Sequence, residues 1–443
     1  MTKTINGFSK FSKEEKIAWL AENFFDEPEA AAAELRSWRY ADGKKQKIID
    51  SFTENVVANF PLPFSVAPNF VINGRAYAVP MVIEESSVVA AASSAAKFWA
   101  DRGGIHAEVI QTVKLGQVHF RWNGPFAKLK SLLPDLRAQL DEDSAELTAN
   151  MRQRGGGVLD VELLDYSRLE PEYYQLRVSF DTCDSMGANF INSVLECFGR
   201  SLERFVERHP AFEDSERDVD VLMCILSNYT PDCLARAWVE CPVTELEDLA
   251  RNAGLPGAAA IERFCAAVRI AAIDPYRAVT HNKGIFNGID AVVLATGNDF
   301  RAVEACGHAY AARDGQYRSL SRAEVKAGLF RFELQIPLAL GAVGGLTALH
   351  PLAKRALQML GSPSARELMM IAAAVGLAQN FAAVRSLVTT GIQQGHMRMH
   401  LSNILFQLGA DAADCAAAEA HFRNHTISFS CVRKFLEARK ALS

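Results

Sequence analysis

The chain has 443 residues, a length that favours two or three domains because one compact core rarely organises so many residues. Hydrophobic residues make up 49% and charged residues 22% of the sequence, as in most globular proteins, and the formal net charge is −5. This charge excludes the basic excess that is typical of nucleic-acid binding. Nine cysteines without paired spacing indicate reduced thiols rather than a disulfide framework, so we expect a cytoplasmic protein.

No membrane segment is predicted. The polar stretch Met1–Lys16 lacks the apolar centre of a signal peptide. The most apolar long stretch, Ile336–Leu349, is shorter than the ~20 residues that cross a bilayer and contains three glycines. We therefore expect Ile336–Leu349 to be buried core and the protein to have no membrane partner.

The first part of the chain combines helices with short strands. Glu14–Phe25 has apolar residues at helical spacing, and the alanine-rich Ser86–Ala100 also predicts a helix. Between them, Asn73-Gly74 separates two β-prone runs and predicts a hairpin. Strand-like runs then flank one polar helix near Phe126–Leu140, and we place a smaller inserted domain at 111–228.

The remaining elements continue this mixture. Tyr174–Phe180 alternates apolar and polar residues and predicts a half-buried strand, which leads through a turn at Asp184–Asn189 into a helix. The apolar run Ala291–Ala295 predicts a strand that ends in a polar turn. Ile371–Ile392 predicts a long apolar helix, and the C-terminal residues predict further helices.

Several catalytic signatures are missing. The sequence has neither GxGxxG after a strand nor a P-loop, so neither a Rossmann domain nor a P-loop enzyme is indicated. HExxH and paired Cys/His ligand sets are also missing, so no metal is expected, and GxSxG of the commonest serine hydrolases is not found. The remaining candidates are polar residues in apolar or glycine-rich surroundings.

Two acids and a lysine are candidates of this kind. Glu85 follows an apolar run and could be a partly desolvated general acid, or a surface acid near a helix N-terminus. Lys283 lies among glycines and hydrophobic residues, and Asp299 follows the predicted strand. A Lys283–Asp299 pair could polarise a carbonyl oxygen or be a structural salt bridge, and the residues alone leave both open.

Two further features are less specific. His396 and His400 would share one helix face, without an apparent third metal ligand, so a single acid/base histidine and two structural histidines are the alternatives. The turn Asp184–Asn189 precedes a helix whose N-terminal N–H groups could bind phosphate, although many such turns only cap helices.

Together these blocks resemble hydroxymethylglutaryl-coenzyme A (HMG-CoA) reductases, and in detail the soluble bacterial class II form. The resemblance runs nearly end to end. It rests on motifs in the same order: Glu54-Asn55-Val56, Val66–Asn69, Val79–Glu85, Asp184–Asn189, Thr280–Asp290, Gly297–Glu304, Val343–Thr347, His350-Pro351, Gly376–Asn380 and Gly391–Met397. One departure is Ser86, which stands where the family pattern has proline after the two glutamates.

The resemblance implies which residues form the site. The family's catalytic glutamate, lysine, aspartate and histidine correspond to Glu85, Lys283, Asp299 and His396, and an asparagine of the same network corresponds to Asn287. Substrate-contacting positions correspond to Ser87, Arg277, Gln379 and Asn380. Positions that contact the dinucleotide correspond to Asp160, Asp184, Met186, Gly187 and Asn189.

The family reaction interconverts HMG-CoA with mevalonate and free coenzyme A through a thiohemiacetal and mevaldehyde, using two nicotinamide dinucleotides. By resemblance, Lys283 would stabilise the oxyanion, Glu85 would deliver a proton, and Asp299 would hold both in register. His396 would protonate the departing thiolate. Asp160 resembles the acid that faces the adenosine ribose in NAD-using members, so NAD(H) is favoured and NADP(H) stays possible.

The resemblance also implies an α+β fold. A large substrate-binding and dimerisation domain would comprise 1–110 and 229–389, a small non-Rossmann dinucleotide-binding domain 111–228, and a mobile helical flap 390–443. A homodimer with active sites at its interface is implied, with higher assembly of dimers open. The alternatives are another coenzyme A thioester enzyme, such as a hydrolase or acyl transferase, and a non-catalytic coenzyme A-binding homologue.

Overall fold

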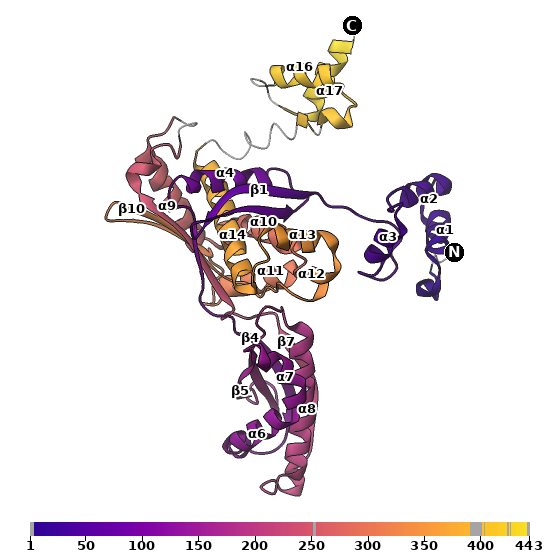
Figure 1. Cartoon of the computed structure of the whole chain (residues 1–443), viewed down its shortest axis with the longest axis vertical. Helices are drawn as coiled ribbons and strands as arrows, with labels where there is room; N and C mark the ends of the chain where they lie inside the picture. Colours follow the sequence, from indigo (N-terminus) through magenta and orange to yellow (C-terminus); the bar gives the residue numbers. More distant parts are fainter. Residues whose placement is uncertain are drawn as a thin grey trace.

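The computed structural model describes residues 4–250, 254–389, 401–402, 404–422, 425 and 427–440. They form a large body (residues 64–109 and 234–388), a small unit (residues 114–227), and separate N-terminal and C-terminal groups of helices (Figure 1). Helices and antiparallel sheets occur together, so the predicted α+β class is confirmed.

The N-terminal helices stand to one side of the large body (Figure 1). They are α1 (Lys13–Phe24), α2 (Pro28–Ser37) and α3 (Gly43–Asp50). Ser12 begins α1 with a capping box, because its hydroxyl accepts from the Glu15 N–H while its own N–H donates to the Glu15 carboxylate. The helix predicted over Glu14–Phe25 is confirmed.

The large body combines a hairpin, a four-stranded sheet and the helices around them. Its strands are β1 (Phe64–Ile72), β2 (Arg75–Val82), β3 (His106–Val109), β8 (Leu234–Pro242), β9 (Ser321–Lys326) and β10 (Leu329–Pro337). Its helices are α4 (Val88–Ala100), α9 (Gly257–Ile273), α10 (Pro275–Ala295), α11 (Phe300–Ala311), α12 (Gly345–Leu349), α13 (Pro351–Met359) and α14 (Ala365–Val388). The sheet is antiparallel in the order β3-β8-β10-β9.

The β1–β2 hairpin confirms the prediction from Asn73-Gly74. The φ angles of Asn73 and Gly74 are 49° and 79°, the left-handed values that a two-residue type I′ turn requires. The Asn73 side chain also donates to and accepts from the backbone of Ala107, which ties the turn to β3. The helix predicted within Ser86–Ala100 is α4 and is confirmed as well.

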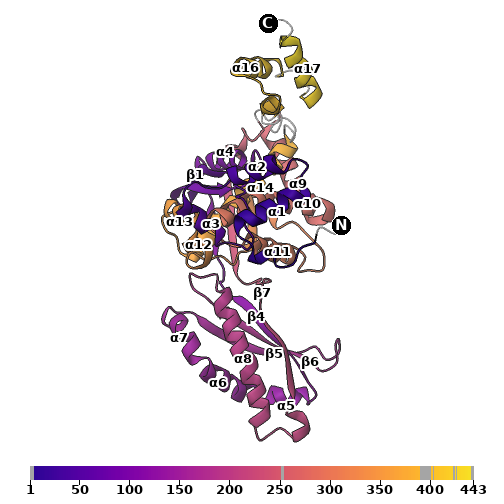
Figure 2. The ribbon, with the colours of Figure 1, turned by 90° about the vertical axis from the view of Figure 1, so that its right-hand side faces the viewer.

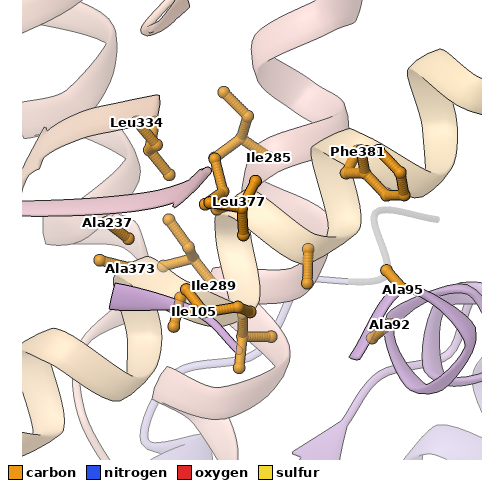
Figure 3. Packing of buried hydrophobic residues seen from close by; sticks show 14 of the residues in the cluster. Ala92, Ala95, Ile105, Ala237, Ile285, Ile289, Leu334, Ala373, Leu377 and Phe381 are labelled. Carbon is orange, nitrogen blue, oxygen red and sulfur yellow. The ribbon is translucent and has the colours of Figure 1, made fainter. Parts of the chain in front are cut away.

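The core of the large body lies around α10 and α14 (Figure 3). Ile285 and Ile289 of α10 point toward Leu377 and Ala373 of α14. Gly288 permits this close approach, because a Cβ atom there would lie only 2.8 Å from the Cβ of Gln379. By length and composition α14 could cross a membrane, but 83% of its apolar window is buried inside the protein.

The small unit lies at the lower end of the molecule in Figures 1 and 2. Its elements are β4 (Lys114–Trp122), α5 (Phe126–Ser131), α6 (Leu133–Asp143), α7 (Ala145–Gln153), β5 (Gly157–Asp165), β6 (Tyr173–Asp181), α8 (Ala188–Arg208) and β7 (Val219–Ser227). The antiparallel sheet has the order β5-β6-β4-β7. The helix predicted after Asp184–Asn189 is α8, and its apolar stripe is buried in a core separate from that of the large body.

The connections to the small unit leave and return side by side. β3 precedes the unit and β8 follows it, and these two strands pair with each other from His106↔Trp238 to Val109↔Ala235. The boundaries placed at 111 and 228 fall in the β3–β4 and β7–β8 connections, and they stay a prediction. The C-terminal helices α16 (Ala412–His421) and α17 (Phe429–Lys440) have a small core of their own.

One prediction from an apolar run is wrong, and another holds only in part. Ala291–Ala295 is the last part of α10 rather than a strand, because a helix buried on all sides produces the same short apolar run as a buried strand. Only the first part of Ile336–Leu349 is core, since Val343 and Leu349 are 51% and 62% exposed. Glycines 341, 344 and 345 interrupt that stretch after β10.

Two helix predictions need new bounds. The helix near Phe126–Leu140 is divided into α5 and α6, and Pro134 stands in the first turn of α6, where its missing N–H costs nothing. The helix predicted over Ile371–Ile392 begins earlier, at Ala365, and its described part ends at Val388. Ser364 sets the earlier start through a capping box with Glu367.

A buried polar network joins α10, β9 and α14. The Ser321 hydroxyl donates to Asn380 Oδ1 at 2.7 Å, and His281 Nε2 lies 2.6 Å from the same hydroxyl oxygen. The Asn380 amide donates back to the His281 carbonyl at 3.4 Å. Burial, with a smaller effect of Arg277, lowers the pKa of His281 to about 3, so the imidazole is neutral and donates from Nε2.

Ser321→Ala should lower the free energy of unfolding by about 1–3 kcal/mol, because it leaves His281 Nε2 and Asn380 Oδ1 buried without partners. Urea denaturation monitored by circular dichroism measures this change. Ser131→Ala is the matched control, since that exposed hydroxyl bonds only to the Lys128 carbonyl at the surface. Equal stability of the two variants would contradict the role of the network.

A carboxyl pair lies between α10 and α11. Burial, and then the adjacent Glu304, which also hydrogen-bonds to it, raise the pKa of Asp290 to about 8. One Asp290 oxygen is buried without a hydrogen-bond partner among the described residues. His308 is near Glu304 and is held by Tyr317, 2.7 Å away. Two carboxyls share this apolar site because one of them keeps its proton at neutral pH.

Protonated Asp290 should make stability depend on pH. Because its pKa is higher in the folded state, the free energy of unfolding should fall between about pH 4 and pH 8, by up to about 1.4 kcal/mol per pH unit for one proton. Asp290→Asn should flatten this slope and raise stability at pH 8. Urea titrations at several pH values test it, and an unchanged slope in the variant would exclude Asp290 as the titrating group.

Candidate active site

The structure brings Glu85 and Lys283 together. Glu85 lies between β2 and α4, and Lys283 lies on α10, which packs against β2. The Lys283 ammonium donates to Glu85 Oε2 at 2.5 Å, and the two side chains are 58% and 38% exposed. These residues are 198 positions apart, so only the fold creates this ion pair on an accessible surface.

Asp299 is engaged differently from the sequence-based expectation. It is the N-cap of α11, where its Oδ1 accepts from the backbone N–H groups of Arg301 and Ala302 and from the Arg301 side chain. Within the described ranges no Lys283–Asp299 ion pair is formed, so that expected pair is not found in this state. An aspartate directly before a helix satisfies the first-turn N–H groups, which fixes its Oδ1 and leaves Oδ2 for another partner.

Lys283 belongs to a polar line along α10. Residues at i, i+4 and i+7 share one helix face, which places Asn287 and Asp290 on the same side as Lys283. Asn287 is half-buried. The Asp290–Glu304 pair was not predicted from the sequence. The signal was available, because Asp290 is the one acid inside the apolar run Ile289–Val293 of α10.

The predicted substrate contacts fall into two groups. Ser87 and Arg277 are half-buried, and Ser87 has a φ of 74°. Burial lowers the pKa of Arg277, and Arg277 has no ion pair among the described residues. Gln379 and Asn380 are buried in α14. Asn380 is occupied by the Ser321 network, whereas the Oε1 of Gln379 has no hydrogen-bond partner in the described structure. Substrate contact by Asn380 would therefore require that network to open.

The predicted dinucleotide turn lies where the small unit meets the large body. Gly187 is the N-cap of α8 with a φ of 88°, and no side chain of the described residues caps the helix, so its first N–H groups have no side-chain acceptor there. A Cβ at Gly187 would lie 2.4 Å from Thr182 Cγ2, which excludes larger residues. Met186 is half-buried and Asn189 is exposed. Such a terminus suits a phosphate group.

Two charged residues, one in this turn and one below it, already have hydrogen-bond partners. The Asp184 carboxylate accepts from the Ala365 N–H at 2.7 Å, at the start of α14, so it serves as a connection to the large body. Lys114, the first residue of β4, was not predicted from the sequence; it is buried below the turn and donates to the Thr182 hydroxyl and to the Ser185 carbonyl. Burial lowers the pKa of Lys114.

The remaining predicted residues lie elsewhere. Asp160 is on β5, and its carboxylate pairs with Arg137 of α6 at 2.8 Å, with both side chains about half exposed. His396 lies outside the described residues. Among the residues that the structure describes, no group of three His, Cys, Asp or Glu side chains could hold a metal ion.

Comparison with known proteins gives a consistent result. The family model described as Hydroxymethylglutaryl-coenzyme A reductase matches residues 12–401. The 3-hydroxy-3-methylglutaryl-coenzyme A reductase of Archaeoglobus fulgidus is 36% identical over 99% of this chain and 95% of its own length. A probable 3-hydroxy-3-methylglutaryl-coenzyme A reductase of Borreliella burgdorferi is 32% identical over 83% of this chain and 81% of its own.

Solved structures agree with these relatives. A 3-hydroxy-3-methylglutaryl-coenzyme A reductase of Streptococcus pneumoniae is 35% identical, with a TM-score of 0.71, over 98% of this chain and 99% of that one. The class II enzyme of the same organism, bound to NADPH in open conformations, is 36% identical, with a TM-score of 0.70, over 87% of this chain and 100% of that one. The chain belongs to the hydroxymethylglutaryl-coenzyme A reductase family.

Proposed function

We propose that this oxidoreductase interconverts HMG-CoA with mevalonate and coenzyme A at a centre formed by Lys283 and Glu85. The 2.5 Å contact between their charged groups carries the proposal, because it places a cationic hydrogen-bond donor beside a carboxylate that can accept and deliver a proton on an accessible surface. Bound nicotinamide dinucleotide supplies the hydride.

Lys283 would act on the carbonyl oxygen of the thioester and later of the aldehyde. Its ammonium group stabilises the negative charge that develops there, and the fixed position on α10 means that little reorganisation is needed. Glu85 would then return a proton to the oxygen. The short Lys283–Glu85 contact lets the proton pass between the two side chains.

Asp299 and Asn287 would complete the centre. Asp299 is fixed through Oδ1, so its second oxygen can accept from Lys283 once substrate separates Lys283 from Glu85. Asn287 lies one turn from Lys283 on the same face of α10. We place His396 on a C-terminal flap, 390–443, where it would protonate the departing coenzyme A thiolate, and we assign Arg277 to a substrate carboxylate or phosphate.

The small unit, which lies within the predicted domain 111–228, would bind the dinucleotide. The uncapped N-terminus of α8, with Gly187 and Met186, suits the pyrophosphate, and Asn189 is exposed beside it. We favour NAD(H), because the Asp160 carboxylate would accept from a ribose 2′-hydroxyl and repel a 2′-phosphate. Arg137, 2.8 Å from Asp160, weakens that repulsion, so NADP(H) is expected to be used less well rather than excluded.

We also propose a cytoplasmic homodimer with its active sites at the interface. The half-exposed Lys283–Glu85 pair leaves room for groups from a second copy. Aromatic side chains on and after the N-terminal helices remain exposed, at Phe24, Trp38, Tyr40 and Phe60. Exposed aromatic side chains on this N-terminal segment are the kind of surface that a second copy of the chain would cover in a stable dimer.

The alternatives are less well supported. A thioester hydrolase or acyl transferase would need neither a dinucleotide-binding turn nor Asp160, and it would not change the absorbance of the nicotinamide. A non-catalytic homologue would not need to keep Glu85, Lys283 and Asp299 together with His396. The reductase relatives also match nearly the whole chain.

Lys283→Ala should reduce kcat for oxidation of NADH by HMG-CoA about 100- to 1,000-fold, because the oxyanion loses its cationic donor. Absorbance at the NADH band measures the rate. Lys97→Ala is the matched control, since Lys97 is an exposed lysine of α4, and it should keep full activity.

Two results would contradict the proposal. Substantial turnover by folded Lys283→Ala would remove the lysine from the reaction. If the unmodified protein shows no turnover in either direction with either dinucleotide, the chain shares ancestry with the family but not its reaction.

Light scattering on the same samples tests the dimer, and a fully active monomer would exclude active sites at an interface.

Asp160→Ala should lower the ratio of kcat/KM for NADH to that for NADPH about tenfold. The change removes a negative charge and frees Arg137 for a 2′-phosphate. Glu162→Ala is the control, because Glu162 is an exposed acid two positions further along β5, 3.9 Å from Arg177. An unchanged ratio in Asp160→Ala would show that Asp160 does not face the ribose.

A further inference from the structure

The turn at Asp184–Gly187 is held by the large body as much as by its own sheet. The Asp184 carbonyl accepts from the N–H groups of Ala342 and Val343, at 2.8 and 3.3 Å. Ser185 forms an isolated parallel β-bridge with Val343. The segment 341–343, which follows β10, therefore acts as a backbone support for the turn.

Asn298 fixes this support from the other side. Its Nδ2 donates to the Gly341 carbonyl at 3.0 Å, and its Oδ1 accepts from the Gly341 N–H at 2.8 Å. The side chain is 9% exposed, so both bonds are sheltered from water. Asn298 directly precedes Asp299, and both lie in the connection between α10 and α11.

Gly341 is the point at which the support meets the turn. A Cβ atom there would lie 2.4 Å from the backbone nitrogen of Met186 and 3.0 Å from the carbonyl carbon of Ser185. The φ of Gly341 is not in the left-handed region, so the glycine is needed for space rather than for its backbone conformation. No flexible side chain could move to relieve that contact.

We propose that Asn298 and Gly341 are positioning residues that hold the dinucleotide turn in register with Asp299. A continuous path joins the two sites. A peptide bond links Asp299 to Asn298, two hydrogen bonds link Asn298 to Gly341, and the backbone of Gly341 lies close to that of Met186. Each of these links tolerates little displacement. The inference rests on the proposed function, because it takes the turn as the dinucleotide site. Neither residue touches the reacting atoms.

Gly341→Ala tests this directly. The added methyl group must displace the turn, so the Kd for NADH, measured by calorimetry without thioester, should rise about tenfold or more. The KM for HMG-CoA should stay within about twofold of the unmodified protein, which a general loss of structure would not allow. Gly43→Ala is the matched control, since a Cβ there meets nothing within 4 Å, and its Kd should be unchanged.

Asn298→Asp is the second variant. It keeps the acceptor for the Gly341 N–H but loses the donor to the Gly341 carbonyl, and it should also weaken NADH binding. If Gly341→Ala does not fold, this variant decides. If a folded variant binds NADH with an unchanged Kd, the positioning role is overturned, and the proposed dinucleotide turn is not. No NADH binding by the unmodified protein would instead overturn the proposed dinucleotide turn.

Discussion

Gly288 of α10 lies so close to α14 that any side chain there would collide with Gln379. This contact sets the depth and rotation of α10 in the core, with Ile285 and Ile289 directed inward. On a helix fixed in this way, Lys283, Asn287 and Asp290 must share the opposite, less buried side. The position of these three polar residues is therefore a consequence of the apolar packing on the other side of α10.

Charge then determines what each member of that line can do. Lys283 meets a carboxylate at the surface, where water and a counter-ion both support its charge. Asp290 meets a second carboxyl in an apolar site, where only one of the two can ionise. Asp290 therefore keeps its proton at neutral pH because of its burial and its carboxyl neighbour, and not because of its residue type.

Much of this could be predicted from the sequence, where the signal is local. Asn73-Gly74 specifies its turn through left-handed backbone angles, and the stripe of α8 specifies its buried face through spacing. Ala291–Ala295 could not be assigned in this way, because full burial removes the periodicity that distinguishes helix from strand. The long α14 is also buried on nearly all its faces, but its length distinguishes it from a strand.

The site shows a similar division. The residue types at 85, 283 and 299 carry the family resemblance, but their partners do not follow from it. Lys283 meets Glu85 while Asp299 caps α11, and Asn380 bonds to Ser321, because hydrogen-bond choice depends on distances that only the packed chain defines. Lys114 gave no signal at all, since a single lysine beginning a strand is ordinarily at the surface.

The pairing of β3 with β8 has a consequence for how the chain acquires this shape. The two strands are far apart in sequence, so joining them early would close a very long flexible loop. If β4–β7 fold first, their separate core brings both ends to one side and shortens the effective loop. Folding of the small unit would then bring β8 beside β3 in the large sheet. The rate at which the large body folds would therefore depend on the stability of a unit outside its core.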